Sequence, residues 1–132
     1  MQKKIVITGG EGRFAQVLKR DNKKLDILYP SKKELNILNI NSINKYLKKN
    51  KPKYLIHAAA LSRPMNIHDK QISKSIDLNI IGTANIVKVC SELKIKLIYF
   101  STGYVYEGKI GNYKEVDPVL PVNNYAWSKL GG

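Results

Sequence analysis

The sequence contains little of what several classes of protein depend on. Its single cysteine, Cys90, excludes an internal disulfide and is typical of a reducing compartment. The two histidines and one cysteine are not spaced as metal ligands, so we predict no metal site. No apolar run approaches the roughly 18 residues of a membrane span, and the short apolar run before Gly9 does not fit a signal peptide. We therefore expect a cytoplasmic protein with no membrane partner.

Acidic residues are also few, and basic charge is in large excess. The 23 lysines and arginines against 10 acids give a net charge of +13, which can indicate nucleic-acid binding. However, only three of these residues are arginines, and the lysines are spread over predicted helices and loops. No zinc-finger spacing or RNA-binding aromatic motif accompanies them. We interpret the lysines as a solvated surface and rank nucleic-acid binding last among the alternatives.

Apolar runs and helical patterns alternate along the 132 residues, a length that suits one domain. Short apolar runs that end in small or turn-forming residues predict strands at 4–8, 25–29, 54–60 and 97–101. Helical spacing predicts helices at 13–20, 42–50 and 72–93, with Ser42 as an N-cap, a loop over 103–122, and a last helix from about residue 123. This alternation predicts an α/β fold, a Rossmann-type doubly wound parallel sheet with helices on both faces and ligands at the carboxyl ends of its strands.

The segment 8–15, Thr-Gly-Gly-Glu-Gly-Arg-Phe-Ala, links the first predicted strand to the first helix. Gly9 permits a tight turn, Gly12 lets the backbone approach a pyrophosphate, and the small Ala15 lets helix and strand pack closely. The helix N-terminus then offers free amides and a partial positive charge to the phosphates. A glycine-rich string alone is weak evidence, but a strand before it and a helix after it favour a dinucleotide site over a plain turn.

The choice between NAD and NADP is read after the second strand. A carboxylate there would hold the ribose 2′-hydroxyl of NAD, whereas a basic residue tolerates the 2′-phosphate of NADP. The segment 29–33, Tyr-Pro-Ser-Lys-Lys, has no carboxylate, and Arg13 lies near the same corner. We therefore predict NADP(H) over NAD(H), with Lys32 at the 2′ position. The alternative is that Lys32 and Lys33 are ordinary surface lysines.

A phenol and an ammonium lie one helical turn apart at Tyr125 and Lys129. The phenol can donate a proton to a developing alkoxide, and the ammonium lowers the phenol pKa and can bind ribose hydroxyls. The Thr102 hydroxyl could bind the same substrate oxygen. The spacing alone is weak evidence, because Tyr29 and Lys33 repeat it by chance. The position of Tyr125 after a hydroxyl-rich strand end favours it over Tyr29, which Pro30 follows.

In combination, these segments resemble the extended short-chain dehydrogenase/reductases, and most closely the dTDP-4-dehydrorhamnose reductases and related nucleotide-sugar reductases. The resemblance rests on the glycine turn, on His-Ala-Ala-Ala at 57–60, on Ser-Thr-Gly-Tyr-Val-Tyr-Glu-Gly at 101–108, and on the Tyr125/Lys129 pair. The segments Glu-Leu-Asn-Ile at 34–37 and Tyr-Lys-Glu-Val-Asp-Pro at 113–118 are similar to the nucleotide-sugar branch. The likeness covers essentially the whole chain.

The resemblance implies that Thr102, Tyr125 and Lys129 are catalytic, with Tyr125 as the proton donor. The reaction it implies is reduction of a 4-keto-6-deoxy nucleotide sugar by hydride from the nicotinamide. The predicted cofactor site joins Lys32, Tyr125 and Lys129 to the positions that the family likeness supplies: Gly9, Gly12, Arg13, Phe14, Asn36, Ile37, Ala58, Ala59, Ala60 and Asn79. A homodimer through the helix of Tyr125 is a further expectation from the family.

The chain departs from the family pattern in sequence and in length. Gly103 and Asn36 stand where aspartates are usual, and Ser-Arg-Pro-Met at 62–65 replaces an acidic stretch. Family members are about twice as long, so we expect residues 1–132 to form an incomplete NAD(P)-binding Rossmann domain, an N-terminal fragment without the C-terminal substrate lobe. We expect such a chain to bind cofactor weakly and to turn over little substrate.

Two other functions stay open at this point. The chain could be a non-catalytic NAD(P)-binding regulatory subunit, or a nucleotide-sugar epimerase or dehydratase of the same superfamily. Among the remaining polar residues, His57 is expected to be structural or to line the cofactor. His68 is predicted to lie in a polar loop without a role.

Overall fold

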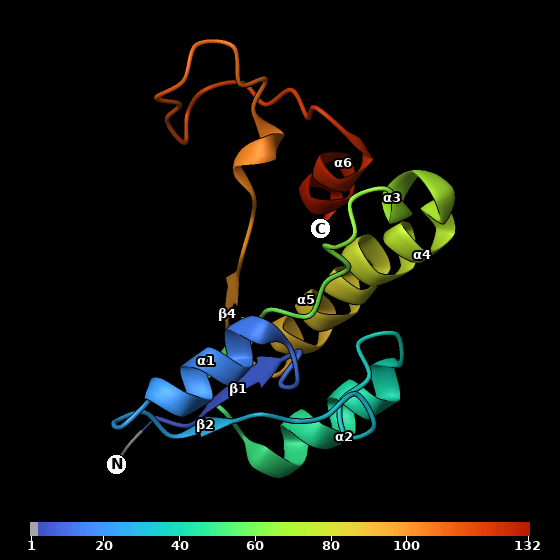
Figure 1. The fold of residues 1–132 in the computed structure, drawn as a ribbon. Coiled ribbons are helices and arrows are strands. Elements are labelled where there is room, and N and C mark those ends of the chain that lie inside the picture. Colours follow the sequence, from blue (N-terminus) through green and yellow to red (C-terminus); the bar gives the residue numbers. More distant parts are fainter. Residues whose placement is uncertain (1–2) are drawn as a thin grey trace.

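The computed structural model describes residues 3–132, which fold around a four-stranded parallel sheet (Figure 1). The strands are β1 (Ile5–Thr8), β2 (Ile27–Leu28), β3 (Tyr54–His57) and β4 (Lys96–Tyr99), in the order β2-β1-β3-β4. The strand order reverses direction between β1 and β3, and open parallel sheets bind ligands at such a point. The register pairs Thr8 with His57, so both strands end together at this edge.

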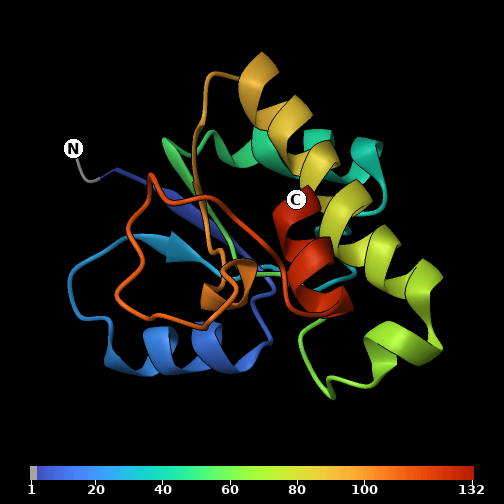
Figure 2. The same ribbon diagram turned by 90° about the horizontal axis from the view of Figure 1, so that it is seen from above.

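Helices cover both faces of the sheet, which confirms the predicted Rossmann-type architecture. Figure 2 shows α1 (Arg13–Asp21) on one side of the strands, and α2 (Ile40–Asn50) and α5 (Gly82–Glu92) on the other. The main core lies on the α2/α5 face, where Val6 and Leu55 of the sheet meet buried aliphatic side chains of both helices. Its members also include Leu35, Ile37, Ile43, Leu47, Ile86, Val89, Cys90 and Ile95.

Two predicted boundaries are corrected by local hydrogen bonds. Asn39, not Ser42, is the N-cap of α2, because the Asn39 side chain accepts from the Ser42 amide at 3.0 Å. The second strand is shorter than predicted, because the Asn22 side chain bonds both the N–H and the C=O of Leu25. The backbone of Leu25 therefore pairs with Asn22 instead of extending the sheet.

The long helix predicted over 72–93 is interrupted. It consists of α4 (Ile72–Ile76), a single turn of π-helix η1 (Asp77–Ile81) and α5, and the short α3 (Ile67–Lys70) precedes it. Apolar spacing predicted this region as one helix because a single π-turn shifts the pattern by only one residue. Such turns are frequent at functional sites, and this one contains Asn79.

The chain after β4 has little regular structure before its last helix. A 3₁₀ turn, η2 (Gly103–Val105), interrupts the predicted loop, and α6 (Asn124–Gly131) follows with Asn123 as its N-cap. Helix α6 lies beside α4 and η1 (Figure 1). Within residues 3–132, none of the helices has the length and apolar character needed to cross a membrane. The same residues contain no cluster of three metal-binding side chains.

Candidate functional site

The carboxyl ends of β1 and β3 are joined by the Thr8 hydroxyl. Its oxygen accepts hydrogen bonds from the amides of Ala58, at 3.2 Å, and Ala59, at 3.1 Å. Because these two donors occupy its lone pairs, the hydroxyl proton is directed to His57 Nδ1, 2.7 Å away. Thr8 therefore holds the turn after β1 and the turn after β3 against each other.

His57 continues this network into the long helix. With Nδ1 accepting from Thr8, the proton lies on Nε2, which donates to the Thr83 hydroxyl at 3.0 Å. Thr83 in turn donates to the Asn79 carbonyl at 2.7 Å. Burial, with a contribution from the Lys129 charge, lowers the pKa of His57 to about 4. The imidazole is therefore neutral and structural, in agreement with its predicted role.

The glycine turn has the geometry that a phosphate-binding loop requires. Gly9 has a φ of +70°, and a Cβ added there would lie 3.0 Å from backbone atoms of Ala59. The Gly12 amide donates to the Gly9 carbonyl at 2.8 Å, which closes the turn. Gly12 is the N-cap of α1 and has no side-chain cap, so the first amides of the helix face outward. The turn thus leaves space and donors for an anion.

Two cavities meet at this turn and contain most of the predicted cofactor residues. A cavity of about 260 Å³ extends toward the β2–α2 loop, and one of about 600 Å³ extends along the start of α1 and the turn after β3. The first is lined by the predicted residues Gly9, Gly12, Lys32, Asn36, Ile37, Ala59 and Ala60. The second is lined by the predicted residues Gly9, Gly12, Arg13, Phe14, Ala58 and Ala60.

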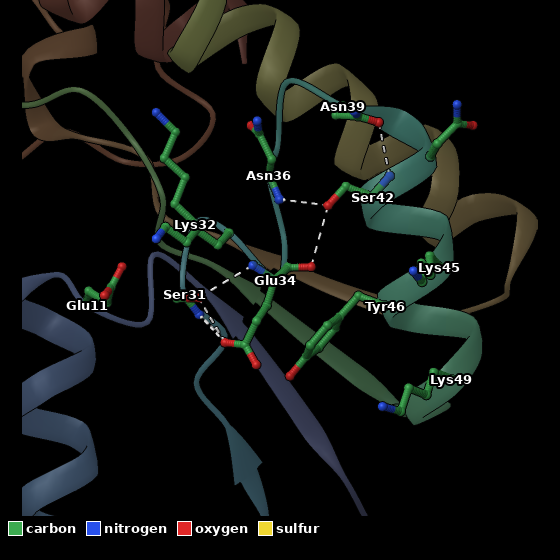
Figure 3. Close-up of a pocket in the computed structure, with 12 residues that line it drawn as sticks. Glu11, Ser31, Lys32, Glu34, Asn36, Asn39, Ser42, Lys45, Tyr46 and Lys49 are labelled. Carbon is green, nitrogen blue, oxygen red and sulfur yellow. Dashed lines mark hydrogen bonds between the residues drawn. The ribbon is translucent and has the colours of Figure 1, made fainter.

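A third, open cavity of about 1070 Å³ continues beyond Lys32 (Figure 3). Lys45 and Lys49 line it from α2, and Glu34 lies between the loop and the helix. The Glu34 carboxylate accepts from the Ser31 amide and hydroxyl, at 2.8 and 2.9 Å, and these bonds lower its pKa. Lys32 lines both this cavity and the smaller one, so it lies at their junction.

Asn79 connects the turn after β3 to helix α6. Its side chain accepts from the Leu61 amide at 2.7 Å and donates to the Leu61 carbonyl at 2.8 Å and to the Ser128 hydroxyl at 2.8 Å. The residue is 1% exposed and lines neither cavity at the glycine turn. Direct contact with a cofactor stays a prediction for Asn79, whereas its support of both neighbouring segments is observed.

Lys129 is buried at the same edge. It is 6% exposed, and its Nζ lies 4.2 Å from the centre of the Tyr99 ring. The Tyr99 hydroxyl donates to the Lys129 carbonyl at 2.9 Å. Burial lowers the pKa of Lys129 to about 8. Tyr99, which ends β4, thus supports the predicted catalytic lysine at both its backbone and its ammonium.

Tyr125 packs between two aromatic rings. Its ring centre is 5.0 Å from that of His68 and 6.3 Å from that of Tyr104. The Tyr104 amide donates to the Thr102 hydroxyl at 3.3 Å, so the turn that carries Thr102 also contacts Tyr125. Thr102, Tyr125 and Lys129, predicted from sequence as a trio, therefore belong to segments that contact one another.

His68 does not lie in a polar loop, as was predicted from the sequence. It is on α3, 1% exposed, with its Nδ1 2.7 Å from the Ser75 hydroxyl. Burial lowers its pKa. The next residue, Asp69, accepts from the Asn124 side chain at 2.7 Å, which joins α3 to the start of α6.

Sequence reasoning missed Tyr99 and His68 for different reasons. Tyr99 ends a strand beside the Ser101–Thr102 pair, and this position could have indicated a role at the edge. No local signal marked His68, because it packs against Tyr125 of α6, which lies more than fifty residues further along the chain.

Together, the fold and this edge define a class: a Rossmann-type α/β domain with a glycine turn at its topological switch point. The chain belongs to the RmlD substrate binding domain family, whose model matches residues 3–132.

Individual relatives agree with this family. The chain is 28% identical to a dTDP-4-dehydrorhamnose reductase of Aggregatibacter actinomycetemcomitans, over 98% of this chain and 45% of the relative. It is 34% identical to a methionine adenosyltransferase 2 subunit beta of Xenopus laevis, over 74% of this chain and 29% of the relative. The crystal structure of dTDP-4-dehydrorhamnose reductase from Bacillus anthracis in complex with NADP superposes with a TM-score of 0.92 and 29% identity, over 99% of this chain and 48% of that one. The chain thus spans less than half the length of these relatives.

Proposed function

We propose that the chain forms the cofactor-binding half of an NAD(P)-dependent reductase of a 4-keto-6-deoxy nucleotide sugar. The observation that carries the proposal is the Gly9–Gly12 turn with its two cavities at the sheet edge where Lys129 packs against Tyr99, the last residue of β4. The similarity to two dTDP-4-dehydrorhamnose reductases supports the same substrate class.

The residues at the edge fit such a cofactor and such a reaction. A bound NAD(P)H would supply the hydride. Gly9 and Gly12 leave space for its diphosphate, and the outward-facing amides of α1 would donate to it. We propose that Tyr125 donates the proton to the substrate oxygen and that Thr102 hydrogen-bonds the same oxygen. Lys129, whose pKa of about 8 keeps it mostly charged at pH 7, would stabilise the phenolate and bind ribose hydroxyls.

We further propose a preference for NADPH over NADH. Lys32 lies where the smaller cavity opens into the lysine-lined one, which is a favourable place for a 2′-phosphate. The NADP complex of the Bacillus anthracis relative is consistent with this choice. Titration calorimetry of the 132-residue chain with each cofactor tests it. We expect heat from NADPH and a weaker signal from NADH, and Lys32→Ala should reduce the difference.

Binding and turnover distinguish the main proposal from a second one. The second proposal is a non-catalytic NAD(P)-binding regulatory subunit, and the similarity to a protein named as a subunit of methionine adenosyltransferase supports the subunit role. NADPH consumption with a dTDP-4-keto-6-deoxy sugar, lost in Tyr125→Phe, would support the reductase. Cofactor binding without turnover, even after the chain is extended by a substrate lobe of a relative, would support the subunit. Absence of binding to either cofactor would contradict both.

We also propose that the protein acts in the cytoplasm as a homodimer that associates through α6. Trp127 and Leu130 of α6 are 55% and 40% exposed, and Ile76 and Ile81 on the neighbouring helix are exposed as well. Sedimentation velocity tests the dimer, and Trp127→Glu should shift it toward monomer.

A further inference from the structure

Two arginines line one cavity from two different segments of the chain. Arg13 opens α1 immediately after the glycine turn, and Arg63 lies on the segment that follows β3. Both line the cavity of about 600 Å³ at the start of α1, together with Gly9 and Gly12 of the glycine turn and Ala60 and Ser62 of the segment after β3. The cavity is thus lined by one arginine from each of two separate segments.

Neither guanidinium is neutralised by the protein. No lining residue of this cavity is acidic, and within residues 3–132 neither Arg13 nor Arg63 has an ion pair or a side-chain hydrogen bond. The third arginine, Arg20, is by contrast paired with Asp21 at 2.6 Å. An anion in this cavity would meet two arginines whose charge no acidic lining residue offsets.

The choice of arginine over lysine at this cavity also points to a phosphate ligand. The chain has only three arginines among 23 basic residues, so most of its positively charged side chains are lysines. Two of the three line this groove. Arginine differs from lysine in its planar fork of donors, which matches two oxygens of one phosphate.

The backbone that carries Arg63 is held in place. Leu61, two residues before it, is bonded at both its N–H and C=O by Asn79, at 2.7 and 2.8 Å. The uncapped N-terminus of α1, which starts at Arg13, has no acidic residue in its first turn, so its amides add to the positive field. A group with two linked phosphates would therefore meet donors from both segments.

We propose that Arg63 is a second diphosphate-binding residue, which acts with Arg13 in the cavity at the glycine turn. The ligand chemistry is a diphosphate ester, which both a dinucleotide cofactor and a nucleotide sugar contain. The proposal rests on the proposed function for its ligand, although the site itself is defined by the two arginines.

The test measures binding to the 132-residue chain by titration calorimetry and ³¹P NMR. The probes are NADPH, NADH, dTDP and inorganic pyrophosphate, and the variants are Arg63→Gln and Arg63→Lys. Arg20→Gln is the matched control, because it removes the same charge at an arginine outside the cavity. We expect Arg63→Gln to weaken pyrophosphate and both dinucleotides at least tenfold and equally. Arg63→Lys should recover part of the lost affinity, and Arg20→Gln should keep the wild-type affinities.

The probes separate the sources of the diphosphate and the two proposals. A loss for pyrophosphate and dTDP with unchanged dinucleotide binding would assign the arginine pair to the nucleotide sugar. Pyrophosphate binding that depends on Arg63, without any nucleotide binding, would contradict the proposed function and support the site. Wild-type affinities in Arg63→Gln, an equal loss in Arg20→Gln, or no pyrophosphate binding at all would overturn the role of Arg63.

Discussion

The Thr8 hydroxyl donates a hydrogen bond to His57 Nδ1 across the two central strands, at 2.7 Å. Because the same hydroxyl accepts from two amides of the turn after β3, it cannot accept a hydrogen bond from the Nδ1–H of a charged imidazole without giving up one of them. The hydrogen bonds at the edge that carries the glycine turn therefore favour the neutral form of His57.

This arrangement predicts acid sensitivity in a defined range. The pKa of His57 is about 4 in the folded chain against an ordinary value of 6.5, so the unfolded state binds the extra proton. The free energy of unfolding should fall as the pH drops from 6.5 to 4, by about 3 kcal/mol. Urea unfolding between pH 7 and pH 4 measures it, with His57→Gln as the comparison. An equally steep fall in His57→Gln would show that other groups cause the acid sensitivity.

Lys129 predicts a gain of stability in alkali. Its pKa is about 8 in the folded chain and 10.5 otherwise, so the folded state holds fewer protons between these values. The buried ammonium therefore costs stability below pH 8, and this cost disappears as the pH rises to 10.5. Lys129→Met should exceed the wild type in stability by about 2–3 kcal/mol at pH 7 and by little at pH 10.5. NMR of ¹³C-methylated lysines should show one resonance that titrates near pH 8. If every lysine titrates near 10.5, the ammonium is solvated.

Gly9 should not tolerate a side chain. Gly9→Ala combines a φ of +70° with a Cβ 3.0 Å from Ala59, so we expect a loss of about 2–3 kcal/mol in unfolding free energy and loss of NADPH binding. Gly103→Ala is the matched control, because a Cβ there meets no atom within 4 Å and its φ is not positive. It should change stability by less than about 0.5 kcal/mol. Equal effects of the two substitutions would contradict the geometry of the turn.

Asn79 should matter more than a typical buried amide. Asn79→Ala removes three hydrogen bonds and leaves the Leu61 amide without its partner, so we expect a loss of about 3 kcal/mol. Asn85→Ala removes only one bond, from the side chain to the Ile37 carbonyl at 3.0 Å, and should cost about 1 kcal/mol. Thermal and urea unfolding give both values. A loss in Asn79→Ala no greater than that in Asn85→Ala would show that the network contributes little.

Much of the fold could be predicted because its signals are local. The buried strands are short β-branched runs, and the glycine turn is defined by residues within one segment, 8–15. Both predictions depend on backbone preferences that neighbouring residues set. The predicted cofactor residues from 9 to 60 come together for the same reason, since they follow strands whose order the fold class dictates.

The remainder depends on contacts between distant segments. Neither the π-turn at Asp77–Ile81 nor the burial of His68 follows from periodicity, because each is stabilised by α6 or by the turn after β3. Ser42 is an N-cap residue by type, but the helix begins earlier, because Asn39 accepts from the Ser42 amide and so places Ser42 inside the first turn. Arg63 was noted only as a departure from an acidic pattern, and its proximity to Arg13 required the folded chain.

One buried amide, that of Asn79, touches both the wall that would hold a diphosphate and the helix that presents the proposed proton donor. If a ligand orders the segment at Leu61, less conformational entropy remains to be lost when α6 becomes ordered, and the reverse also holds. By thermodynamic reciprocity, a ligand that orders the Tyr125 side chain should increase the affinity for a dinucleotide. A dinucleotide bound at the glycine turn should increase the affinity for that ligand by the same factor.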